Sequence, residues 1–122
     1  MSRRSISMVA LAAVALALPL AAGAALHNRL AKSVPAADET VAPPKEVRLW
    51  FTEKVEPKFS SITVMGTDSA KVETTKAIAT DDPKSIKVDL TGAMAAGAYQ
   101  VTWRTAGDDG HAVRGKYTFT VK

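Results

Sequence analysis

Short runs in which apolar and polar residues alternate are the strongest structural signal in this sequence. In Glu46–Phe51 the apolar residues Val47, Leu49 and Phe51 share one parity, and the intervening positions hold Glu, Arg and Trp. A period of two is typical of a β-strand that buries one face. We therefore predict a strand here, with its apolar face turned toward a core.

The same alternation recurs along the chain between turn-forming Gly, Pro and Asp residues. The further predicted strands are Ser61–Gly66, Ser85–Leu90, Ala98–Thr105 and Gly115–Lys122, with weaker candidates at Asn28–Val34 and Lys71–Ile78. About seven short strands at this spacing predict an all-β domain, either an antiparallel sandwich or a Greek-key barrel. The chain has no cysteine, so such a domain depends on its core and not on disulfides.

Large side chains on the predicted inward faces are interpreted as core. Tyr99, Trp103, Tyr117 and Phe119 all fall on such faces. Met65 and Met94, the two methionines beyond the N-terminal segment, are also assigned to packing. A soft Cu(I) site needs several thioethers close together, and these two lie 29 positions apart.

The first 26 residues have the composition of an export signal. A basic start precedes an apolar run from Met8 to Leu20, and small residues follow it. This order is typical of a secretory signal peptide, and the run is shorter than the ~20 residues of a bilayer span. We predict a signal peptide over residues 1–26, cleaved between residues 24 and 27, and one domain over 27–122. An uncleaved anchor and a twin-arginine signal are the alternatives.

The charge balance of the exported part gives no support for a nucleic-acid partner. Loss of Arg3 and Arg4 lowers the 16 basic residues to 14, against 12 acidic ones, so the net charge falls to +2. No basic run longer than two residues remains. Nucleic-acid binding depends on clustered Lys and Arg, and we therefore predict none.

Both histidines of the chain lie outside the predicted strand faces. His111 follows Asp109 in a polar loop between two strands, and His27 lies at the start of the exported part. Loops on rigid scaffolds commonly carry binding groups, and imidazole with carboxylate suits Cu(II), Zn or Ni. Asp109 and His111 are two residues apart, so in an extended stretch both side chains point the same way. A solvated turn is the alternative interpretation of this motif.

Several motifs together resemble the CopC family of copper-resistance proteins. They are His27-Asn28-Arg29-Leu30, Val47–Glu53, Ala96–Arg104, Asp109–Gly115 and the strand Lys116–Val121. The resemblance covers nearly the whole exported part. Its most specific portion is the Gly-x-Tyr-x-Val-x-Trp-Arg strand, which Asp-x-His and Gly-x-x-x-Phe follow.

This resemblance implies an immunoglobulin-like β-barrel of the periplasm that binds Cu(2+). It implies metal ligands at His27, Asp109 and His111, with His27 chelating through both its amine and its ring. It also implies a non-catalytic copper carrier or buffer in copper resistance or import, with an inner-membrane importer of the CopD type as a partner. The residues around Met65 do not reproduce the family's Met-rich Cu(I) loop, so we expect the protein to bind Cu(II) and not Cu(I). We also expect it to be a monomer.

The cleavage point departs from the expected pattern. Cleavage directly before His27 leaves Leu26 where small residues are favoured. Cleavage after Ala24 places the histidine third in the chain, and a third-position histidine chelates Cu(II) through the amine, two amides and the imidazole. The freed α-amino group is a candidate donor in either case, because its pKa is low enough for a metal to displace the proton.

Two other functions fit the same residues. An N-terminal histidine chelate can activate oxygen, so an oxidative copper enzyme is one alternative. A metal-independent immunoglobulin-like interaction domain is the other. A copper titration and an oxidase assay distinguish the three.

Overall fold

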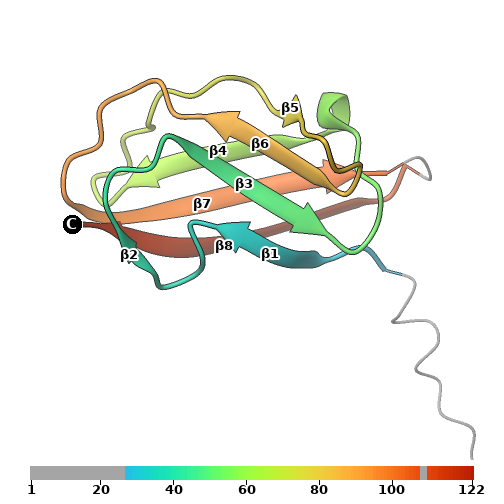
Figure 1. Ribbon diagram of the computed structural model, residues 1–122, viewed down its shortest axis with the longest axis horizontal. Coiled ribbons are helices and arrows are strands. Elements are labelled where there is room, and N and C mark those ends of the chain that lie inside the picture. The colour runs from blue at the N-terminus through green and yellow to red at the C-terminus, as the bar shows by residue number, and fades with distance from the viewer. Residues whose placement is uncertain (1–26, 108–109) are drawn as a thin grey trace, which may run out of the picture.

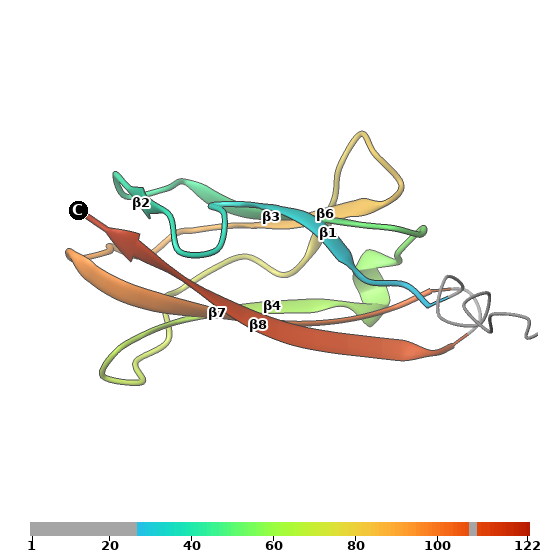
Figure 2. The same ribbon diagram turned by 90° about the horizontal axis from the view of Figure 1, so that it is seen from below.

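Two four-stranded β-sheets packed face to face form the domain (Figures 1 and 2). The computed structural model describes residues 27–107 and 110–122. In chain order the strands are β1 (Leu30–Val34), β2 (Thr40–Val41), β3 (Glu46–Phe51), β4 (Ser61–Gly66), β5 (Ile78–Ala79), β6 (Ser85–Asp89), β7 (Gly97–Ala106) and β8 (Ala112–Val121). A short 3₁₀ helix, η1 (Pro57–Phe59), precedes β4.

The strand order separates the chain into two layers. The first sheet has the order β1-β3-β6-β5 and the second has the order β2-β8-β7-β4. Neighbouring strands are antiparallel, except that β2 runs parallel to β8. The β7–β8 hairpin is the longest ladder, and its last pair before the loop is Ala106 with Ala112. The predicted all-β, immunoglobulin-like sandwich is confirmed.

Inward-facing residues of both sheets meet in one core, as their period of two predicts. The predicted inward residues of β3 and β7 are all buried. Phe51 contacts Trp103 edge-to-face across the core, with ring centroids 5.1 Å apart, and Tyr99 stacks on Phe119 at 5.8 Å. Such aromatic pairs stabilise a core beyond the area they bury. Tyr117 is only half-buried and packs against this cluster.

The Tyr117 hydroxyl is an isolated polar group at the edge of the core. It is buried and has no hydrogen-bond partner within the described residues. Burial, with the negative charge of Glu39 acting in the same direction, raises the pKa of Tyr117 to about 12. Ser33 opposes this shift from nearby, but its hydroxyl does not reach hydrogen-bonding geometry with the phenol oxygen.

Gly115 allows the Trp103 indole to lie directly against the neighbouring strand. The two residues are paired across β7 and β8. A Cβ atom at position 115 would lie 2.6 Å from Cζ2 and 2.9 Å from Cε2 of Trp103. Both distances are well inside van der Waals contact, so the hairpin requires glycine here to keep the indole in place.

The predicted strand Lys71–Ile78 is wrong for most of its length. The segment forms single bridges, Met65 with Lys71 and Thr74 with Leu90, and pairs as a strand only at β5. Its first bridge is to the second sheet and its second bridge lies at the end of the first sheet. The chain crosses between the layers here, and a crossing segment cannot continue along one ladder.

Candidate metal centre

The two histidine-bearing segments lie at the same end of the sandwich (Figures 1 and 2). His27 precedes β1 by two residues, and β1 begins at this end. His111 comes directly before β8, where the β7–β8 hairpin turns. Both side chains are exposed. The fold therefore brings the segments that carry the two histidines to one end of the sandwich.

Asn28 fastens the N-terminal segment to the end of the sandwich. Its side-chain oxygen Oδ1 accepts hydrogen bonds from the Glu53 backbone N–H at 3.0 Å and the Thr52 hydroxyl at 3.3 Å. The Arg29 N–H donates to Thr52 Oγ1 at 3.1 Å, and the Thr52 N–H donates to the Arg29 carbonyl at 2.9 Å. These four bonds, here called the N-terminal clamp, fix the backbone next to His27.

The loop from β3 to β4 links this clamp to the β7–β8 hairpin. Its Glu56 N–H donates to the Ala106 carbonyl at 3.4 Å, at the last residue of β7. The Ser60 and Thr105 hydroxyls form a 2.6 Å hydrogen bond. Residues 52–60 therefore contact both the segment that carries His27 and the strand that leads to His111. One loop therefore supports both the N-terminal segment and the end of β7.

The hairpin loop that carries His111 has a tight turn. Gly110 adopts a positive φ of 80°, in the region that glycine reaches without strain, and its N–H donates to the Gly107 carbonyl at 3.1 Å. Asp109, the third predicted ligand, lies outside the described residues. Within residues 27–107 and 110–122, no three His, Asp or Glu side chains converge on a point that could hold a metal ion.

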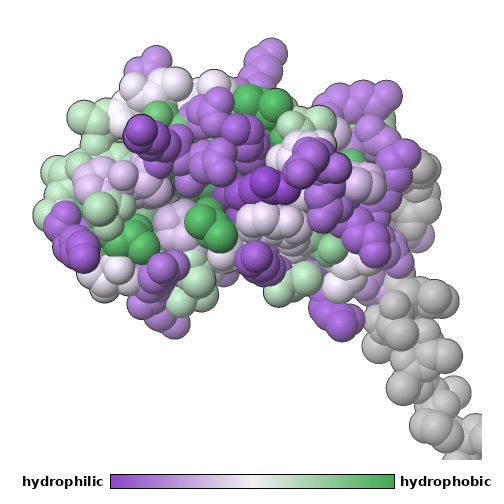
Figure 3. All heavy atoms as spheres, in the orientation of Figure 1, coloured by the Kyte–Doolittle hydropathy of each residue, from purple (hydrophilic) through white to green (hydrophobic). Residues whose placement is uncertain are grey.

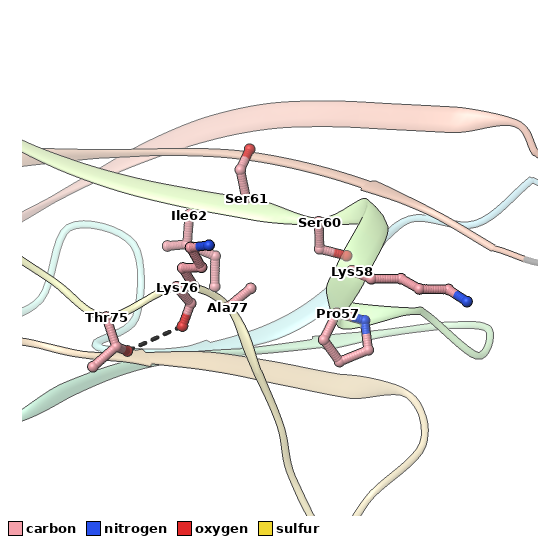
Figure 4. A pocket seen from close by; sticks show the side chains of 8 residues that line it. All are labelled: Pro57, Lys58, Ser60, Ser61, Ile62, Thr75, Lys76 and Ala77. Atoms are coloured by element: carbon pink, nitrogen blue, oxygen red, sulfur yellow. Dashed lines mark hydrogen bonds between the residues drawn. The ribbon is translucent and has the colours of Figure 1, made fainter.

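A surface pocket beside η1 has no metal-binding side chains in its lining. It has a volume of about 430 Å³ and lies between η1, the start of β4 and residues 75–77 (Figure 4). Its lining contains no carboxylate or imidazole. Lys58 points away from it, and the Thr75 hydroxyl donates to the Lys76 carbonyl at 3.0 Å. The end of the sandwich thus remains the candidate site.

Fold and site together define a small immunoglobulin-like sandwich with histidines on two loops at one end. The chain belongs to the CopC family, because the CopC domain model matches residues 30–122. Sequence analysis predicted this membership, and the prediction is confirmed. In the described part of the chain, no helix has the length and apolar character needed to cross a membrane.

Individual relatives agree with this assignment. Copper resistance protein C of Escherichia coli is 36% identical, over 88% of this chain and 90% of that protein. Copper resistance protein C of Xanthomonas campestris pv. juglandis is 32% identical, over 93% and 95%. The crystal structure of CopC from Methylosinus trichosporium OB3b has a TM-score of 0.72 and 38% identity, covering 79% of this chain and 94% of that one. That of PcoC, described as a methionine rich copper resistance protein from Escherichia coli, has a TM-score of 0.71 and 38% identity, covering 79% and 99%.

The N-terminal clamp is the part of the site that sequence reasoning missed. Asn28 and Thr52–Glu53 belong to motifs that resemble the family, but no ligand role is assigned to them. Their contact joins residues 25 positions apart through one side-chain oxygen. No periodicity or spacing rule in the sequence indicates such a bond.

Proposed function

We propose that this protein is a periplasmic Cu(II) carrier or buffer that acts in copper resistance or copper import. The observation that supports the proposal is that the His27 and His111 segments lie at the same end of the sandwich (Figure 1), where residues 52–60 contact both the N-terminal clamp and the end of β7. Copper is proposed as the metal because relatives of this chain are named copper resistance protein C. An inner-membrane copper importer of the CopD type is the proposed partner, and the monomer is the proposed form.

The proposed ligands are His27, Asp109 and His111, completed by the α-amino group that signal cleavage frees. Two imidazoles, a carboxylate and an amine form the nitrogen-rich, tetragonal set that suits Cu(II). The ligands must lose their protons to bind, so loading releases protons. The exposed positions of both histidines allow copper to enter and leave without opening the core.

Cu(II) is proposed over Cu(I) because thioether ligands are sparse. Met94 packs against the core, and Met65 lies half-buried on the outward face of β4. The related PcoC is described as methionine rich, whereas this chain has two methionines beyond residue 26. Without thiolates or clustered thioethers, a second site for the softer ion has no ligands in this chain.

Isothermal titration of natively processed protein with Cu(II), alongside electron paramagnetic resonance, tests the ligand set. We expect one Cu(II) per chain, and a loss of affinity by orders of magnitude in His111→Ala, because an imidazole ligand is removed. Asp109→Ala is expected to lose less, since carboxylate is the weaker donor. Glu73→Ala, which removes an exposed carboxylate elsewhere, is the matched control and should bind as wild type does.

Two results would contradict the proposal at different levels. Unchanged affinity in His111→Ala would refute the shared site and leave copper on the N-terminal residues alone. A free-copper resonance spectrum in wild-type protein would refute copper binding itself. Intact mass of the processed chain fixes its first residue and therefore identifies which N-terminal chelate is present.

A further inference from the structure

On the outward face of the first sheet, basic side chains form ion pairs with acidic ones. Arg48 pairs with Asp81 at 2.9 Å, and Lys87 pairs with Glu46 at 2.9 Å and Asp89 at 3.1 Å. The space-filling view from this side shows hydrophilic residues with hydrophobic ones scattered between them (Figure 3). Neighbouring opposite charges give this face little net field at a distance.

The outward face of the second sheet carries cations without counter-charges. Alternation along β7 and β8 turns Arg104, Arg114 and Lys116 away from the core, and all three are exposed. The register places Arg104 directly opposite Arg114, and Lys116 opposite Thr102. None of the three cations forms an ion pair with a residue that the structure describes.

The rest of this surface is neutral. Its other outward positions are Ser61, Thr63 and Met65 of β4, Ala98, Gln100 and Thr102 of β7, and Ala112, Thr118 and Thr120 of β8. Asp38 and Glu39 are hydrogen-bonded through their backbones to Thr118 and Thr120. That places them toward the end of β8 opposite the hairpin loop. The outward side chains of β4, β7 and β8 around the three cations are here called the cationic face.

The pairing of Arg104 with Arg114 lowers the stability of the fold, which indicates that the two arginines serve in binding. Like charges directly opposite each other on paired strands are destabilising, and neither arginine of the Arg104–Arg114 pair forms an ion pair with an acid among residues 27–107 and 110–122. A neutral residue at either position would serve the fold better. The same sheet uses neutral threonine opposite Lys116. An anionic partner that covers the two arginines would relieve their repulsion.

The chemistry of the face favours lipid headgroups over a protein as that partner. Stable protein interfaces have an apolar centre with aromatic or other large anchors. The cationic face has no aromatic side chain, and its single large apolar side chain, Met65, is half-buried. Mobile phosphate headgroups need no matching shape and can gather around each cation. We propose that the cationic face docks the protein electrostatically on a membrane surface rich in anionic phospholipids.

Docking in this way has a consequence for the candidate copper site. Arg114 follows His111 by three residues, and Arg104 lies two residues before the end of β7. The cations therefore lie next to the hairpin loop that carries the histidine. A docked molecule holds that loop close to the lipid surface, where membrane proteins are reached by diffusion in two dimensions. The docking itself does not depend on copper.

Sedimentation with lipid vesicles measures the proposed binding. The probes are vesicles of phosphatidylglycerol with phosphatidylethanolamine, and vesicles of phosphatidylcholine alone, each mixed with natively processed protein. Each cation near an anionic surface contributes about fivefold to partitioning, so three contribute roughly a hundredfold. We expect binding to the anionic vesicles at about 0.1 M salt and its loss at about 1 M, where the Debye length falls from ~10 to ~3 Å.

Three variants separate this face from net charge and from misfolding. Replacement of Arg104, Arg114 and Lys116 together by Gln should lower partitioning roughly a hundredfold. Replacement of Lys45, Lys76 and Lys84 by Gln removes the same charge elsewhere on the surface and should leave most of the binding. The double variant Arg104→Lys, Arg114→Lys keeps the charges and should bind as wild type does. The thermal midpoint of the first variant should not fall, because it loses a repulsive pair.

Several outcomes would overturn the proposal. Equal losses in the two Gln triples would show that binding follows net charge and not this face. Equal binding to phosphatidylcholine vesicles would show that anionic headgroups are not what is recognised. Absence of binding to anionic vesicles, with binding to polyglutamate that the first triple abolishes, would assign the face to an acidic protein instead.

Discussion

Replacement of Asn28 by alanine tests whether the N-terminal clamp positions His27 or only stabilises the fold. The substitution removes the oxygen that accepts from the Glu53 N–H at 3.0 Å and the Thr52 hydroxyl at 3.3 Å. It leaves the two backbone-centred bonds between Arg29 and Thr52 in place. The segment next to His27 is therefore loosened without being released.

The expected magnitude follows from the two lost bonds. A hydrogen bond contributes ~0.5–1.5 kcal/mol net, and the longer of these two, at 3.3 Å, contributes less than the shorter one. Asn28 is only partly buried, so water replaces part of the loss. We expect unfolding to cost about 1 kcal/mol less, which lowers the thermal midpoint by ~4–8 °C in a domain of this size.

Copper affinity provides the second measurement. If the same ~1 kcal/mol holds residues 27–29 against the sandwich, Asn28→Ala raises the fraction of molecules in which this segment is detached about fivefold. The Kd for Cu(II) at a site that includes His27 then rises by up to the same factor. Asn28→Asp keeps an oxygen acceptor and should restore both quantities. Asp68→Ala is the matched control, because Asp68 accepts from the Ala70 N–H at 3.0 Å in a turn beyond β4. It should lose similar stability with copper affinity unchanged.

Calorimetry and competitive Cu(II) titration on the four proteins decide the matter. A lowered thermal midpoint with unchanged copper affinity in Asn28→Ala would mean that the clamp holds the fold but does not position His27. Equal loss of affinity in Asp68→Ala would mean that affinity merely follows global stability. Either result refutes a positioning role for Asn28.

Two further predictions concern the scaffold. Gly115→Ala forces a methyl group to within 2.6 Å of the Trp103 ring and should lower the free energy of unfolding by ~1–3 kcal/mol in chemical denaturation. Gly66→Ala places a methyl group 3.1 Å from the flexible Asp68 carboxylate and at ordinary contact distance, 3.6 Å, from Tyr99, so it should change stability by less than ~0.5 kcal/mol. Equal losses in the two variants would refute the packing argument. The folded-state pKa of Tyr117 lies near 12, above its ordinary value of 10.0, so its contribution is complete below pH 10 and is lost as the pH rises toward 12. Tyr117→Phe should flatten the stability profile measured between those pH values, and an unchanged decline would assign it to other groups.

The period of two locates four strands because each of them buries one face. β3 and β4 have the predicted bounds, β6 is one residue shorter at its end, and β7 is one residue longer at each end. β2 and β5 were not predicted as they occur, since strands of two residues are too short to show a period. Lys71–Ile78 shows the opposite failure. Its Thr and Val residues favour a strand, but the segment crosses between the two sheets, and tertiary contacts determine where a chain crosses.

Local sequence patterns likewise predict one part of the candidate site, whereas the other part depends on contacts between residues far apart in the chain. The histidines stand out in the sequence because no strand face contains them, and the structure places both at one end. The clamp depends on Asn28 reaching Glu53, which only the β1–β3 pairing brings within 3.0 Å. The cationic face is equally hidden, because Arg104 and Arg114 come from different strands and meet through the hairpin register. The absence of basic runs from the sequence gave no indication of it.

The register of the β7–β8 hairpin couples the two surfaces for which functions are proposed. Even-numbered positions of β8, including Arg114 and Lys116, face outward, and odd-numbered ones, such as Val113 and Phe119, face the first sheet. A slip of one residue would exchange the two sets and expose Phe119. One pairing pattern, in which Trp103 packs on Gly115, therefore buries Phe119 and turns Arg114 and Lys116 outward on the strand that follows His111.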